Sequence, residues 1–104
     1  MAERKEKIER MINLIEFSVI VDVPAGKILG INQTKSVVNA RRIYWKLLFE
    51  NYKLPLEEIA EMSRYELTDI IDGIRKVNEE IALQLSTATY MWNKVMEYLK
   101  ENEE

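Results

Sequence analysis

The clearest hydrophobic pattern in the chain runs through residues 33–53. Two apolar stripes at three- and four-residue spacing follow this stretch; they consist of Val37, Ala40, Tyr44, Leu47 and Leu48 and, beside them, Val38, Trp45, Phe49 and Tyr52. A helix with apolar residues on two sides packs against neighbours on both. We therefore expect residues 33–53 to form a buried central helix, with Ser36 as its N-cap.

Shorter patterns predict helices before the central one. Residues 3–21 have helical periodicity, with an apolar face made of Ile8, Met11, Ile12, Ile15 and Val19. The β-branched run 17–23 would also suit a strand, but the rest of the chain offers no second strand to pair with it. We therefore expect a helix over 3–21, followed by a short helix that Pro24 opens and Gly30 ends.

After the central helix, the pattern predicts a short helix, a tight turn and a longer helix. The short helix opens at Leu54 and Pro55, and the residues that it turns inward are Leu56, Ile59, Ala60 and Met62. A break at Ser63 and Arg64 leads to the longer helix, which begins near Tyr65 or Glu66. Its inner face consists of Leu67, Ile70, Ile71, Ile74, Val77 and Ile81, and its outer face of Thr68, Asp69, Asp72, Arg75, Lys76 and Glu79. This is the layout of a helix-turn-helix, whose second helix can enter the major groove of DNA.

A last helix is predicted over residues 84–101. Its buried side consists of Leu85, Ala88, Trp92, Val95 and Leu99, and its flank of Tyr90, Met91 and Tyr98. The expected fold class is all-α, a compact bundle of five to six helices that contains a helix-turn-helix. At 104 residues, with 47% apolar and 9% aromatic residues, the chain has the size and the core material of a single domain over 1–104.

Composition narrows the chemistry. The chain has no cysteine and no histidine, which excludes disulfides, Cys/His zinc sites, thiol nucleophiles and imidazole acid/base catalysis. The uncharged apolar runs are far shorter than a membrane span, and the N-terminus lacks the hydrophobic region of a signal peptide. We expect a cytoplasmic protein that is not an enzyme, with no membrane partner, no cofactor and no metal.

Charge is distributed unevenly around the net value of -3. Residues 32–53 carry a local positive excess, in which the bases Lys35, Arg41 and Arg42 gather near the start of the central helix. Residues 54–80 are acidic. Positive charge at a helix N-terminus opposes the helix dipole, so these bases suit a negatively charged partner. A solvated helix start without a partner explains them equally well.

The run TKSVVNARRIYWKLLFENYKLPLEEIAEMSRYELTDIIDGIRKV resembles the C-terminal DNA-binding domain of the bacterial replication initiator DnaA. The family pattern reads approximately R-S-V-V-x-P-R-Q-I-A-M-x-L, then L-S-L-P-E-I-G, then R-D-H-T-T-V-x-H-A-I-R-K-I, and the likeness covers roughly 23–81. It implies a fold related to that of the Trp repressor, with a helix-turn-helix over 54–77. It also implies that Lys35 enters the minor groove, that Arg41 matches the arginine of the P-R-Q step, and that Thr68 matches the first base-reading threonine.

The chain departs from this family where the family reads bases. Tyr65 to Asp69 stand in place of Arg-Asp-His-Thr-Thr, and Ala40 replaces the proline. The segment AGKILG lacks the leading glycine and the Lys-Ser/Thr ending of a Walker A loop, so an ATP-driven initiator is excluded for this chain alone. A solitary domain of this type suits a phage or mobile-element protein.

Two functions from different classes remain open. The first is a small DNA-binding regulator of replication or transcription, whose candidate contacts to double-stranded DNA are Lys35, Arg41, Arg42, Tyr65, Thr68, Asp69, Arg75 and Lys76. The second is a protein-interaction module that has lost DNA reading. Its acidic helix would bind a replication protein or a second copy of the chain as a homodimer.

Overall fold

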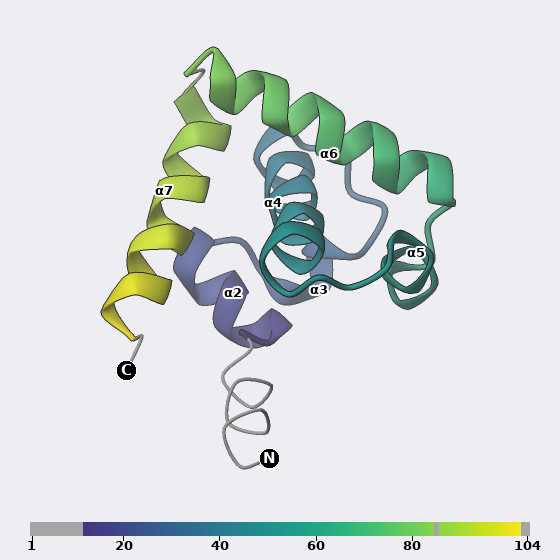
Figure 1. Cartoon of the computed structure of the whole chain (residues 1–104), viewed down its shortest axis with the longest axis horizontal. Helices are drawn as coiled ribbons and strands as arrows, with labels where there is room; N and C mark the ends of the chain where they lie inside the picture. Colours follow the sequence, from purple (N-terminus) through teal and green to yellow (C-terminus); the bar gives the residue numbers. More distant parts are fainter. Residues whose placement is uncertain (1–11, 85, 103–104) are drawn as a thin grey trace.

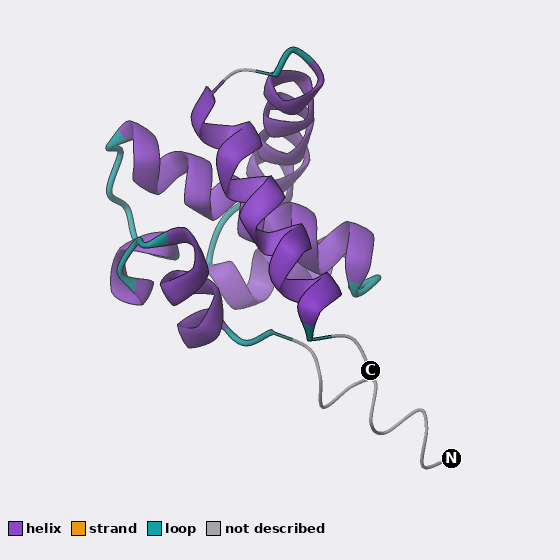
Figure 2. Cartoon of the chain, turned by 90° about the vertical axis from the view of Figure 1, so that its left-hand side faces the viewer, coloured by secondary structure: helices purple, strands orange, loops and turns teal. Residues whose placement is uncertain are grey.

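Helix α4 (Lys35–Lys46) lies in the middle of the molecule, and the other helices surround it (Figure 1). The computed structural model describes residues 12–84 and 86–102, and these form helices and loops with no strand among them (Figure 2). The other elements are α2 (Leu14–Val21), α3 (Ala25–Ile28), the π-helix η1 (Leu47–Asn51), α5 (Leu56–Ser63), α6 (Leu67–Ala82) and α7 (Ser86–Glu101). The all-α prediction is confirmed.

The first apolar stripe of the central helix is buried, as predicted, whereas Phe49 of the second stripe is 38% exposed and Val38 and Tyr52 are half-buried. Ile43, Leu47 and Leu48 are fully buried, and Trp45 is only 3% exposed. The N-cap is Thr34 and not Ser36, because the helix already begins at Lys35. At its other end the backbone widens into η1, where the N–H of residue 52 donates to the carbonyl of Leu47, five residues earlier.

Helix α2 packs against α7 and α3, and its Phe17 and Val21 side chains are buried, with the Phe17 ring 4.9 Å from the Tyr44 ring of α4. Two residues expected on the buried face are exposed, Ile15 by 65% and Val19 by 75%. Both lie on the side of the helix away from Phe17, because two residues along a helix turn the side chain by about 200°. The helix starts after Asn13, whose side chain accepts the N–H of residue 16. The helix prediction itself is confirmed over 14–21, and its part on 3–11 lies outside the described residues.

The short helix between Pro24 and Gly30 is present as α3, with Pro24 as its N-cap. Its Ile28 side chain is fully buried. The loop that follows leads directly into α4.

Helices α5 and α6 form the expected short helix, tight turn and long helix. Arg64 ends α5 in the left-handed conformation, with φ of 61°, and Tyr65 donates its N–H back to Ala60. Glu66 then caps α6, in a reciprocal capping box with Asp69. On the inner faces, Ile59, Ile70 and Val77 are fully buried, as predicted.

Three residues that were expected on these inner faces are exposed. Met62 is 45%, Leu67 36% and Ile71 47% exposed. The side of α6 that is buried is narrower than its apolar pattern suggests, and it includes Gly73, which packs against Trp45 of α4. A Cβ atom at Gly73 would lie 2.8 Å from Cζ3 of Trp45.

Helix α7 closes the bundle against α2, α4 and α6. Ala88 and Val95 are buried as expected, but Met91, expected on the flank, is only 5% exposed. Tyr98 fixes the far end of the helix by donating its hydroxyl proton to the Glu16 carboxylate at 2.5 Å. The predicted burial of Leu85 lies outside the described residues.

Candidate nucleic-acid interface

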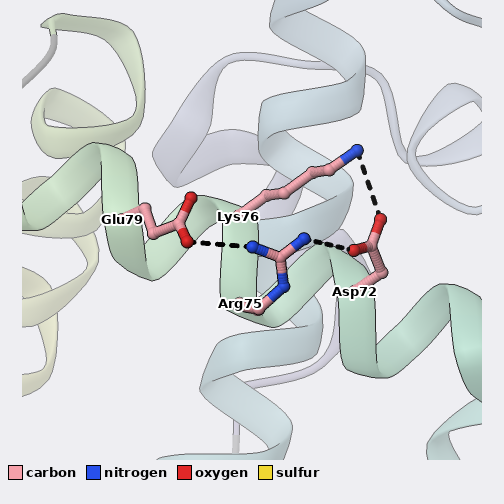
Figure 3. Close-up of polar contacts among 4 residues, drawn as sticks. All are labelled: Asp72, Arg75, Lys76 and Glu79. Carbon is pink, nitrogen blue, oxygen red and sulfur yellow. Dashed lines mark hydrogen bonds and ion pairs between the residues drawn. The ribbon is translucent and has the colours of Figure 1, made fainter.

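The outer face of α6 carries acids and bases that pair with one another (Figure 3). Arg75 donates to Asp72 at 2.6 Å and to Glu79 at 2.9 Å, and the ammonium group of Lys76 lies 3.2 Å from Asp72. Hydrogen bonds from Arg75 and then Lys76 hold the pKa of the Asp72 carboxyl below its usual range. The two bases predicted to contact DNA from this helix therefore already have partners on it.

These pairs do not block the face. The side chains of Arg75 and Asp72 are 55% and 47% exposed. Water and salt screen ion pairs at such exposed positions, so each pair is weak. A DNA phosphate can therefore compete with the carboxylates for Arg75 and Lys76.

Arg41 is a structural residue and not a surface cation, which corrects the expected phosphate contact. Its side chain is 3% exposed. It donates to the carbonyls of Ile28 at 2.6 Å, Asn32 at 2.9 Å and Lys27 at 3.2 Å. Burial lowers the pKa of the guanidinium, and the carbonyl oxygens accept three of its five N–H bonds. Arg41 therefore ties α3 and the following loop to α4.

Tyr65 also has a structural role, because both its hydroxyl and its ring contact other parts of the protein. Its hydroxyl donates to the carbonyl of Gly30 at 2.5 Å, and its ring meets the Trp45 ring edge-on, with 5.1 Å between centroids. The Arg41 guanidinium lies 5.4 Å from the same ring. The half-buried Tyr65 thus connects the turn before α6 to the loop before α4, and it has little freedom to reach a base.

A polar cleft of about 200 Å³ lies between α4 and the first half of α6, and we call it the α4–α6 cleft. Arg42 lines one side, and Asp69 and Asp72 line the other. Within the part of the chain that the structure describes, Arg42 has neither an ion pair nor a side-chain hydrogen bond. Its charge is therefore available to a partner that reaches the rim of this cleft.

Two more of the predicted DNA contacts are exposed to solvent. Lys35 is the first residue of α4, and Thr68 lies in the first turn of α6; both side chains are exposed and make no hydrogen bond to another described residue. Asp69 is exposed as well, and its carboxylate accepts the N–H of residue 66 at 3.2 Å.

The sequence interpretation missed Arg64. This residue lies exposed in the turn between α5 and α6, and no described acid pairs with it. The signal was available, since a base at the break between two helices of a helix-turn-helix lies next to the start of the second helix. Lys35 at the start of α4, Arg42 two turns further along it and Arg64 before α6 are thus three cations that no described acid pairs with.

In comparisons with known proteins, no family model, no curated protein and no solved structure matches the chain. In the described ranges, no helix has the length and apolar character needed to cross a membrane. The same ranges contain no group of three or more acidic side chains arranged to hold a metal ion.

Proposed function

We propose that the protein is a small helix-turn-helix protein that binds double-stranded DNA. The proposal rests on the α5–turn–α6 unit, in which the outer face of α6 is exposed. Three cations outside α6, namely Lys35, Arg42 and Arg64, are not paired with a described acid. In this arrangement α6 enters the major groove, and the three cations lie on the flanking phosphates. The resemblance of residues 23–81 to the DnaA domain supports a role in regulating replication or transcription.

The acids on α6 affect both the affinity for random DNA and the preference for particular bases. Asp69 and Asp72 repel phosphates but can accept hydrogen bonds from the amino group of cytosine. Binding to random DNA is therefore weak and depends mainly on the cations outside α6. A specific site would contain cytosine opposite these two carboxylates.

The test is a titration of labelled random duplex at several salt concentrations. Each phosphate contact contributes a slope of about -0.9 in log affinity against log salt, so the Lys35→Ala/Arg42→Ala variant should flatten the slope by about 1.8. The matched control is Lys94→Ala/Lys100→Ala, which removes the same charge from α7 and should leave the slope nearly unchanged. Equal slopes for the two double variants would place any DNA contact on another surface.

A protein-interaction module is the second candidate, and the pairing of Arg75 and Lys76 with acids of their own helix favours it. The Asp69→Thr/Asp72→Asn variant separates the two functions, because it removes the repulsion, releases Lys76 and leaves Arg75 paired with Glu79 alone. A DNA reader should then bind random duplex more tightly, by an amount that decreases as salt rises. If neither the parent nor this variant binds duplex at low salt, the interaction module replaces the DNA-binding protein as the proposed function.

A further inference from the structure

Arg64, in the turn between α5 and α6, has a backbone conformation that L-amino acids rarely adopt. Its φ is 61° and its ψ is 39°, in the left-handed region. In this region the Cβ atom crowds the following carbonyl oxygen, which is why glycine is the common residue just after a helix. An arginine here is therefore expected to make the protein less stable than a glycine would.

The backbone on both sides of Arg64 is fixed. Arg64 donates its N–H to the carbonyl of Glu61 at 3.3 Å, and Tyr65 donates its N–H to the carbonyl of Ala60 at 3.1 Å. Tyr65 is anchored in turn by its hydroxyl, which donates to the carbonyl of Gly30. The Cα atom of Arg64 therefore has little freedom relative to α6, which begins three residues later.

The side chain of Arg64 has no partner within the described residues. It is exposed and forms neither an ion pair nor a hydrogen bond with any of them, although Glu61 and Glu66 are close to it in the sequence. A guanidinium presents its N–H groups as a planar fork, which matches two oxygens of one phosphate. Because the backbone that carries this fork is already ordered, binding a phosphate requires little further ordering.

We infer that Arg64 positions α6 on DNA by binding a backbone phosphate with its guanidinium. This inference rests on the proposed DNA-binding function and assigns one residue within it. A two-pronged contact fixes the direction of the phosphate as well as supplying charge. Phosphate contacts set the register of a protein on the duplex, and a contact three residues before α6 sets the register of this helix. Arginine at a position that favours glycine thus lowers stability but supplies binding.

Lys53 provides an internal comparison, because it shares the backbone conformation and the charge of Arg64 but not its location. Its φ is also 61°, it is exposed, and it lies three residues before α5. Helix α5 has eight residues and is therefore about 12 Å long, so Lys53 and Arg64 lie at opposite ends of it. This separation exceeds the Debye length of about 10 Å at 0.1 M salt. The left-handed conformation alone does not indicate a DNA contact; the location directly before α6 does.

Glycine substitutions at these two positions separate stability from binding. Arg64→Gly and Lys53→Gly both remove a side chain from the left-handed region, and both should raise Tm by about 2 to 8 °C. In the duplex titration, Arg64→Gly should weaken binding about tenfold at low salt and flatten the slope of log affinity against log salt by about 0.9. Lys53→Gly removes the same charge and should leave the slope nearly unchanged. Partial unfolding cannot explain weaker binding by a more stable protein.

Arg64→Lys distinguishes the charge from the shape of the guanidinium. It keeps the charge and the left-handed side chain, so its Tm and its salt slope should stay close to those of the parent. Its affinity should decrease, but by less than that of Arg64→Gly, because an ammonium group cannot make the two-pronged contact.

Three results would overturn the inference while the proposed function stands, provided that the Lys35→Ala/Arg42→Ala variant still flattens the slope. The first is equal slopes for Arg64→Gly and Lys53→Gly. The second is an Arg64→Lys slope as flat as that of Arg64→Gly, and the third is a Tm of Arg64→Gly below that of the parent. If the parent does not bind duplex at low salt, the proposed function fails and this inference fails with it.

Discussion

The contact between α6 and α4 at Gly73 gives the sharpest prediction about the fold. An alanine Cβ at this position would lie 2.8 Å from Cζ3 and 2.9 Å from Cε3 of Trp45, and 3.3 Å from Cγ of Arg42. Real Cβ atoms do not approach carbon atoms this closely, so either the ring or the helix must move. Gly73→Ala should therefore destabilise the protein, although alanine is the better helix former.

The expected size follows from two opposing effects. In an open helix, changing Gly to Ala stabilises by about 1 kcal/mol. Overpacking a core costs about 1 to 3 kcal/mol. We expect the upper end of this overpacking cost, because the Trp45 ring cannot move easily. The ring is 3% exposed, and its Nε1–H donates to the Ser63 hydroxyl at 3.0 Å. The net loss of about 2 kcal/mol should lower Tm by roughly 8 to 16 °C in a domain of this size.

Urea unfolding followed by far-ultraviolet circular dichroism measures this loss, and the chain supplies its own control. A Cβ at Gly26, in α3, would have open space around it for 4 Å, so Gly26→Ala should stabilise by about 0.5 to 1 kcal/mol. The same substitution is thus expected to have opposite signs at the two sites. In a Trp45→Phe background, which shortens the ring, the cost of Gly73→Ala should decrease. A Gly73→Ala protein as stable as the parent would refute this packing of α6 on α4.

Three further predictions concern polar side chains. Arg41→Leu leaves a buried carbonyl without its donor and should cost about 1 to 3 kcal/mol in urea unfolding, whereas Arg42→Leu should stay within about 0.5 kcal/mol of the parent. Asn39→Leu should stabilise by about 1 to 2 kcal/mol in thermal unfolding, because the Asn39 side chain is 1% exposed and neither its oxygen nor its nitrogen has a partner among the described residues. The Asp72 carboxyl should titrate below its usual range by NMR, and Arg75→Gln should raise its pKa. Since this pKa is depressed in the folded state, its contribution to stability is present above the unfolded-state pKa and disappears as pH falls through the folded-state value.

Each of these has an outcome that contradicts it. Equal unfolding free energies for the Arg41 and Arg42 variants would mean that the three carbonyl bonds contribute nothing. A loss of stability in Asn39→Leu would mean that the larger side chain does not fit the space around the amide. An Asp72 titration unaffected by Arg75→Gln would mean that the pair does not form in solution.

Among the candidate DNA contacts, the sequence did not show which side chains are buried. Lys35 and Thr68 are exposed in the first turns of α4 and α6, and Arg42 lies two turns into α4. Arg41, next to Arg42 in the chain, is inside the protein, because a step of one residue turns a helical side chain by about 100°. That rotation carries it toward the carbonyls of the preceding loop, which only the folded chain brings within reach.

The sequence by itself determined the order of the helices, although not the π-helix that ends the central one, since periodic apolar residues, Pro24, Pro55 and the break at Ser63 and Arg64 are local signals. The tertiary structure decided which part of each apolar face is buried. Gly73 lets α6 approach Trp45 closely, and the direction of that approach leaves Ile71 in an open groove. A periodic pattern shows which side chains share one face of a helix. Whether that face is buried depends on the angle at which two helices cross, and this angle is set by contacts between residues that are distant in the sequence.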